Sequence, residues 1–138
     1  MAVGFRVMFY WYQIGQGEFL HSFFSTVAYN LENEKWGSRF PIIMNELYQG
    51  KVCKENLDKA IEELSTIKEE LQAFDPDKVI WDIEDLSKQP PWGNNISRDI
   101  TDLSNYFVTS DGADFISIFF HALEKAKEID VEIEIKSI

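Results

Sequence analysis

The residues best suited to chemistry form an acidic cluster of Asp82, Glu84 and Asp85. Carboxylate oxygens are the ligands that Mg²⁺ prefers. If residues 78–84 form a strand, Asp82 and Glu84 share one face, with Cβ atoms about 6.6 Å apart. That spacing suits a metal or an acid/base pair, and it suits a solvated strand face equally well. Because no supporting His, Lys or Arg accompanies the cluster, we expect no catalytic residue, no metal, no cofactor and no enzymatic activity.

The other reactive side chains form no recognised motif. No sequence around Cys53 or any serine supplies the base that a nucleophile needs, and Gly15-Gln16-Gly17 lacks the third glycine of a dinucleotide loop. His21 falls off an apolar helical stripe and is predicted to be solvated, whereas His121 is predicted to be a partly buried packing residue. A single cysteine excludes an internal disulfide and fits a reducing cytoplasm.

The aromatic side chains offer a binding function instead. Trp92 lies in the proline-rich loop 90–95 (PPWGNN) beside a glycine. An exposed tryptophan on a stiff loop has the character of an interface hot spot. The alternative is an indole folded back over the open end of a sheet. Trp36 and Trp81 are predicted to lie in the core.

The acidic charge is concentrated in the middle of the chain. The net charge of the 138 residues is −11, and residues 55–85 hold eleven acidic residues and three lysines. Such a field repels nucleic acid and anionic membrane and attracts a basic partner, although it also suits a solubilising surface. The candidate partner-binding residues are therefore Glu62, Glu69, Asp82, Glu84, Asp85 and Trp92.

Composition and pattern predict one folded α+β domain over residues 1–138. Apolar residues make up 45% of the chain and aromatic residues 14%, enough to outweigh the entropy lost on ordering. Arg6 interrupts the apolar N-terminus, and no run approaches the roughly 20 apolar residues of a membrane span. We therefore expect a cytoplasmic protein.

Period-two and helical patterns predict the elements. Strands are expected near residues 3–14, 78–84 and 130–136 and possibly 104–109, where a short helix is also possible. They would form a small mixed sheet packed against three or four helices. Helices are expected near residues 18–31, 41–50 and 57–74, and a last one capped by Asp111. Asn56 is the expected N-cap of the third.

Three short runs and the aromatic first strand carry a resemblance to a known family. They are residues 82–87 (DIEDLS), 90–93 (PPWG) and 106–112 (YFVTSDG). In this order and spacing, the chain resembles the immunity protein 70 family of bacterial polymorphic toxin systems over nearly its whole length. The resemblance implies a small cytoplasmic protein that binds and blocks the active domain of a cognate toxin. It implies no residue-level site, so the candidate residues come from the physical argument alone.

Two rival hypotheses remain at this point. One is a metal-dependent hydrolase that uses the carboxylates of Asp82, Glu84 and Asp85. The other is a non-catalytic regulatory subunit of a larger assembly. A toxin-domain gene immediately upstream would favour the immunity function over both.

Overall fold

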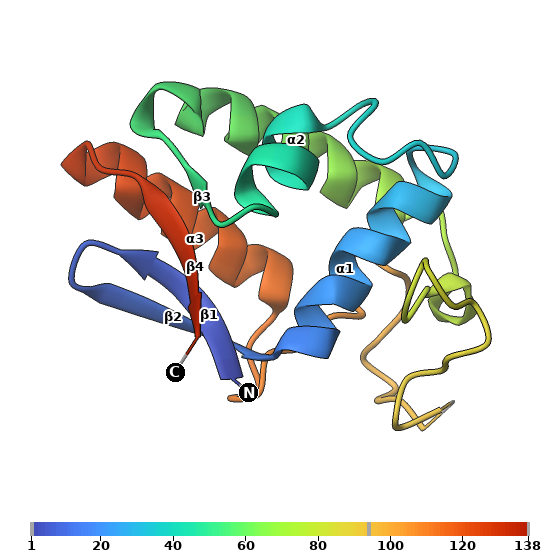
Figure 1. Cartoon of the computed structure of the whole chain (residues 1–138). Coiled ribbons are helices and arrows are strands. Elements are labelled where there is room, and N and C mark those ends of the chain that lie inside the picture. The colour runs from blue at the N-terminus through green and yellow to red at the C-terminus, as the bar shows by residue number, and fades with distance from the viewer. Residues whose placement is uncertain (1, 94, 138) are drawn as a thin grey trace.

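The computed structural model describes residues 2–93 and 95–137, and its sheet joins both ends of the chain and a short strand from its middle (Figure 1). The strands are β1 (Ala2–Val7), β2 (Tyr10–Gln16), β3 (Lys51–Val52) and β4 (Ile133–Ser137). Their order is β2-β1-β4-β3, and every neighbouring pair is antiparallel. The predicted α+β class is confirmed. The predicted mixed sheet is wrong because all of these pairs are antiparallel, and the segments 78–84 and 104–109 do not join the sheet.

The first predicted strand, residues 3–14, is a hairpin. Val7 lies opposite Tyr10, so Met8 and Phe9 form the turn. Met8 adopts a φ of 54°, a left-handed conformation that hairpin turns often require. The turn could not be predicted from the sequence because Met8 and Phe9 include no Gly, Asn or Pro. The alternation of apolar residues also continues across the turn. The β3 strand was not predicted.

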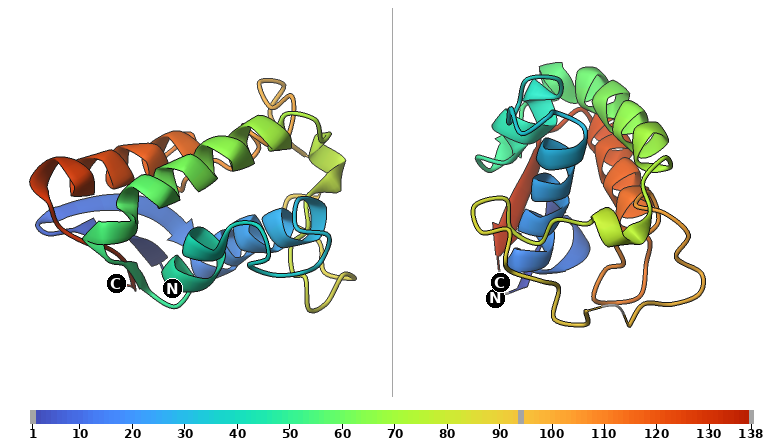
Figure 2. Two further views of the ribbon diagram at one scale, coloured as in Figure 1. Left: turned by 90° about the horizontal axis from the view of Figure 1, so that it is seen from above. Right: turned by 90° about the vertical axis from the view of Figure 1, so that its right-hand side faces the viewer.

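The helices form where the apolar periodicity indicates them. They are α1 (Gly17–Asn30), the π-helix η1 (Ile42–Leu47), α2 (Leu57–Leu71) and α3 (Phe115–Ile129), with short 3-10 turns η2 (Lys54–Asn56) and η3 (Pro76–Lys78). Viewed from above, α2 and α3 run side by side, and α3 packs against the sheet (Figure 2). Helix α1 follows directly from β2, so its N-terminus lies at the end of the hairpin (Figure 1).

Two predicted helix caps are corrected. Asn56 precedes α2, but its side chain donates a 2.9 Å hydrogen bond to Glu46 Oε2 and makes no cap bond. Asp114, not Asp111, caps α3 by accepting from the Ser117 amide at 3.1 Å. An isolated bridge between Val108 and Asp114 closes the preceding turn, so the helix begins only after it.

Aromatic side chains occupy the centre of the core between the sheet, α1 and α3. The ring centroids of Phe23 and Phe115 lie 4.9 Å apart, and those of Phe5 and Phe119 lie 4.8 Å apart. All four side chains are fully buried. Large aromatic surfaces in contact contribute strongly to stability, so this cluster fixes α1 against α3 and the sheet.

Residues 78–84 do not form the predicted strand. The backbone of Ile80 instead bonds to hydroxyls of α1: Ser22 Oγ donates to its carbonyl at 2.8 Å, and its amide donates to Thr26 Oγ1 at 3.0 Å. The Ile83 amide donates to Ser25 Oγ at 3.2 Å. Because these buried side chains satisfy the backbone groups, the segment needs no neighbouring strand. It runs along α1 and places residues 81–91 beside the N-terminus of that helix.

Residues 104–109 form no strand or helix either, and only Val108 makes a bridge. No helix in the described part of the chain is long and apolar enough to cross a membrane. The buried apolar side chains gather into one core cluster. A single domain over residues 1–138 remains a prediction.

Candidate functional site

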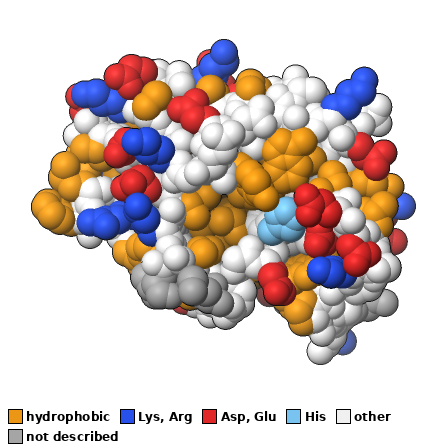
Figure 3. Space-filling view, in the orientation of Figure 1, with side chains coloured by type: hydrophobic (Ala, Val, Ile, Leu, Met, Phe, Trp, Pro, Cys, Tyr) orange, Lys and Arg blue, Asp and Glu red, His pale blue; other side chains and the backbone are white. Residues whose placement is uncertain are grey.

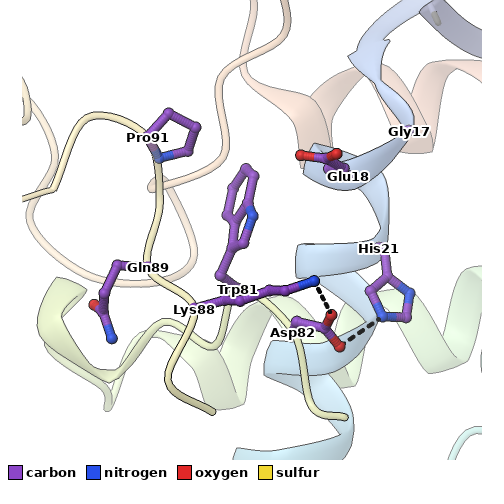
Figure 4. A pocket seen from close by; sticks show the side chains of 8 residues that line it. All are labelled: Gly17, Glu18, His21, Trp81, Asp82, Lys88, Gln89 and Pro91. Carbon is purple, nitrogen blue, oxygen red and sulfur yellow. Dashed lines mark ion pairs between the residues drawn. The ribbon is translucent and has the colours of Figure 1, made fainter. Parts of the chain in front are cut away.

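A cleft of about 560 Å³ lies between the first turn of α1 and residues 81–91 (Figure 4). Helix α1 supplies one wall, and the segment anchored by the α1 hydroxyls supplies the other. The cleft is lined by Gly17, Glu18, His21, Trp81, Asp82, Lys88, Gln89 and Pro91.

Asp82 is the electrostatic centre of this cleft. Its Oδ1 lies 3.4 Å from His21 Nε2, and its Oδ2 lies 3.5 Å from Lys88 Nζ, so both side chains point at the carboxylate (Figure 4). The amide of Glu84 also donates to Oδ1 at 2.9 Å. This backbone bond, followed by His21 and Lys88, lowers the pKa of Asp82. Asp82 therefore stays ionised with partners on both oxygens.

His21 is not solvated as predicted. Its side chain is 27% exposed, and its ring stacks on Trp36 with centroids 6.4 Å apart. The hydroxyl of Tyr48 lies 3.3 Å from His21 Nδ1. The imidazole thus links α1, the 31–50 region and the cleft. His121, predicted to be partly buried, is exposed on α3.

Asp82, Glu84 and Asp85 form a turn and not one face of a strand. Asp85 Oδ1 accepts from the Ser87 hydroxyl at 2.5 Å and from its amide at 3.2 Å. These bonds lower the pKa of Asp85. Local hydrogen bonds therefore hold one oxygen each of Asp82 and Asp85 within this turn. Within residues 2–93 and 95–137, no group of three or more His, Cys, Asp or Glu is placed to hold a metal ion.

Trp92 combines features of both predicted alternatives. Its ring is 38% exposed, yet it meets Trp81 edge-on, with centroids 5.4 Å apart and an interplanar angle of 87°. Its Nε1 donates a hydrogen bond of 2.8 Å to the hydroxyl of Tyr106. Trp81 is buried as predicted. Trp36, also predicted to be core, is only half-buried, and its Nε1 donates to the carbonyl of Met44.

An apolar depression of about 220 Å³ continues from the acidic cleft and shares Glu18, Trp81 and Pro91 with it. A further depression of about 280 Å³ shares Trp92, Phe19 and Val108 with the second. We call the cleft and these two depressions together the Trp92 groove. Figure 3 shows how exposed apolar side chains border a histidine and a group of acidic side chains on one face of the molecule.

The six candidate residues do not all come together. Asp82, Glu84, Asp85 and Trp92 lie on the segment that forms one wall of the groove. Glu62 and Glu69 are exposed on α2, at the top of the molecule in Figure 1, whereas residues 79–93 lie at its lower right.

Sequence reasoning missed the contributions of Glu18, His21 and Lys88 to the groove. One signal was present. The run Ser22, Ser25, Thr26 lies in an otherwise apolar helix, and buried hydroxyls at such positions indicate a polar segment packed against that helix.

The fold and the groove define a small α+β protein that presents aromatic and charged side chains for contact. The family model described as Immunity protein 70 matches residues 5–135, so the chain belongs to this family, as its motifs suggested. The family supports a role as an immunity protein. No curated protein and no solved structure matches the chain.

Proposed function

We propose that this protein binds the toxin domain of a cognate bacterial polymorphic toxin and neutralises it in the cytoplasm by protein–protein contact. The match of residues 5–135 to the Immunity protein 70 family carries the proposal. An immunity protein needs a surface complementary to its toxin and no chemistry of its own. The proposal includes the expectation that the protein is not an enzyme.

The Trp92 groove has the composition of an interface. Tryptophan and tyrosine are enriched at the centres of interfaces, and charged residues are more frequent at their rims. Here the partly exposed Trp92 rests on Trp81, and the exposed carboxylates of Glu84 and Asp85 lie at the border. The net charge of −11 favours a basic toxin surface.

The rival hydrolase is less well supported by this geometry. Both Asp82 oxygens already have protein partners, and Asp85 Oδ1 is bonded to Ser87. A metal site built on these carboxylates needs several ligands placed around one point, and within the described residues no three His, Cys, Asp or Glu side chains are so placed. The other rival hypothesis, a regulatory subunit, predicts a partner that is not a toxin. Protection against a toxin therefore distinguishes the two functions.

The test is co-expression with the candidate toxin domain that the immunity function predicts to be encoded immediately upstream. Cells that produce the toxin domain alone should die, and cells that also produce this protein should survive. A core variant, Phe23→Asp, should give no protection because it buries a charge in the aromatic centre. An unrelated toxin domain should kill with or without the protein. Death of cells that express both soluble cognate proteins would refute the proposed function.

A further inference from the structure

We propose that the Trp92 groove receives an extended basic segment of the toxin, with a Lys or Arg at its acidic end and a neighbouring apolar side chain at its aromatic end. This inference rests on the proposed function and names the part of the toxin that the groove recognises.

The acidic end of the groove is complementary to a cation. Glu18 and Asp82 line the cleft with a single lysine, Lys88, and Glu84 and Asp85 are exposed on the same segment of the chain. Two carboxylates against one ammonium group leave the lysine and acid side chains of the cleft with an excess negative charge, and the net charge of −11 also favours a cationic partner. Lys88 is 58% exposed, so a toxin guanidinium can displace it from Asp82 at little cost in burial.

The apolar end is sized for a side chain. At about 220 Å³, this depression is smaller than the roughly 300–1,000 Å³ of small-molecule sites. Its apolar lining comes from Ile14, Phe19, Trp81, Pro91, Trp92 and Val108. Trp92 and Val108 are 38% and 44% exposed, so a partner side chain would remove their apolar surface from water.

The indole of Trp92 is held in place before any partner arrives. Its Nε1 is bonded to Tyr106, and its ring rests against Trp81. Such preorganisation reduces the entropy lost on binding. An aromatic wall next to carboxylates also suits an arginine or lysine, because the ring face attracts a cation that the carboxylates pair with.

The connected depressions favour an extended segment over a compact one. The acidic cleft shares Glu18, Trp81 and Pro91 with the apolar depression, which in turn shares Phe19, Trp92 and Val108 with the third. Successive side chains of one extended strand can enter depressions that share walls in this way.

The test compares substitutions at exposed groove positions by measuring binding of the purified toxin domain. Val108→Arg places a cation in the groove, Val108→Glu places an anion at the same position, and Glu18→Lys reverses the charge at the other end. We expect Val108→Arg and Glu18→Lys to weaken binding about tenfold or more, as the loss of a hot-spot contact does. Val108→Glu should weaken it less than Val108→Arg. Unfolding midpoints should stay near that of the wild type because both positions are exposed.

Phe9→Ser supplies the matched control, since Phe9 is 91% exposed at the hairpin turn and does not line the groove. It should bind like the wild type. A toxin Arg→Glu or Lys→Glu substitution that weakens wild-type binding and is rescued by Glu18→Lys would identify the cation.

The outcomes separate the two proposals. Wild-type affinity in both Val108→Arg and Glu18→Lys would overturn the groove proposal and leave the immunity function intact. Tighter binding by both would also overturn it, because it would show an acidic segment in the groove. A wild-type protein that binds no toxin would refute the proposed function itself.

Discussion

Trp92 and Tyr106 are joined by a 2.8 Å hydrogen bond from the indole Nε1 to the phenol hydroxyl. Tyr106 is 5% exposed, and burial raises its pKa. The bond therefore ties the PPWG loop to the interior, while part of the Trp92 ring stays open to solvent. The Trp92 side chain thus makes a structural contact and also has an exposed face. Substitutions can separate its effect on stability from its effect on binding.

Trp92→Ala should affect both stability and binding. We expect a loss of about 1–3 kcal/mol in the free energy of unfolding, below the ~3–5 kcal/mol of fully buried aromatic truncations, because the ring is 38% exposed. Toxin binding should weaken by about 2 kcal/mol or more. Trp92→Phe keeps a ring but loses the bond to Tyr106, so it should cost about 1 kcal/mol of stability. Denaturant melts and titration calorimetry measure the two effects, and unchanged affinity in Trp92→Ala would remove this residue from the interface.

Glu32 should be a large contributor to stability without any role at the groove. It is 2% exposed and accepts from the amides of Gly37 and Phe40 at 2.9 and 3.0 Å, and from that of Arg39 at 2.9 Å. Glu32→Gln replaces one acceptor oxygen with a donor facing these amides, which should cost about 2 kcal/mol or more. Glu34→Gln, at an exposed position two residues on, is the control. Equal free energies of unfolding for Glu32→Gln and Glu34→Gln in denaturant titrations would contradict this role of Glu32.

Glu63 should make stability depend on pH. It is 8% exposed, and burial raises its pKa although the amides of Ile43 and Ile42 donate to it. A raised folded-state pKa contributes stability that is fully present below the unfolded value of about 4.3 and is lost as pH rises through the folded value.

Unfolding free energies of the wild type and Glu63→Gln between about pH 4 and 7 test this effect. The variant should be less stable at low pH, because its amide replaces one acceptor of a backbone amide. Its stability should then fall less with rising pH than that of the wild type, so the two curves converge. Glu62→Gln, at the exposed neighbouring position, should follow the wild-type curve. Parallel curves for the wild type and Glu63→Gln would show that Glu63 does not titrate differently on folding.

The acids of α2 should influence the association rate more than the lifetime of the complex. Glu62→Lys with Glu69→Lys reverses two exposed charges and changes the net charge from −11 to −7, since each reversal adds two units. Steering by peripheral charges acts mainly on the association rate constant. That constant should fall severalfold at low salt, and the difference should shrink as the Debye length decreases below about 10 Å.

Reversing Glu124 and Glu128 on α3 changes the net charge equally and tests whether position matters. Surface plasmon resonance at several salt concentrations gives both rate constants. Equal slowing by both pairs would assign the effect to net charge alone. No slowing by either pair would reject electrostatic steering.

The sequence by itself determined the three long helices, the last strand and the family. Period-three-to-four apolar spacing placed α1, α2 and α3, and alternation placed β4, because these patterns report which face of an element is buried. The motifs around Asp82 and Trp92 indicated the immunity protein family, which the match over residues 5–135 confirms.

Only the tertiary structure decided which groups, far apart in the sequence, form hydrogen bonds and ion pairs with one another. Alternation at residues 78–84 indicated a strand, but Ser22, Ser25 and Thr26 satisfy its backbone groups, so no second strand is needed. The ion pair of Asp82 with His21 could not be predicted from the sequence either, because it depends on how this segment lies along α1. Periodicity reports burial, whereas a hydrogen bond or ion pair depends on which segments the fold brings within reach.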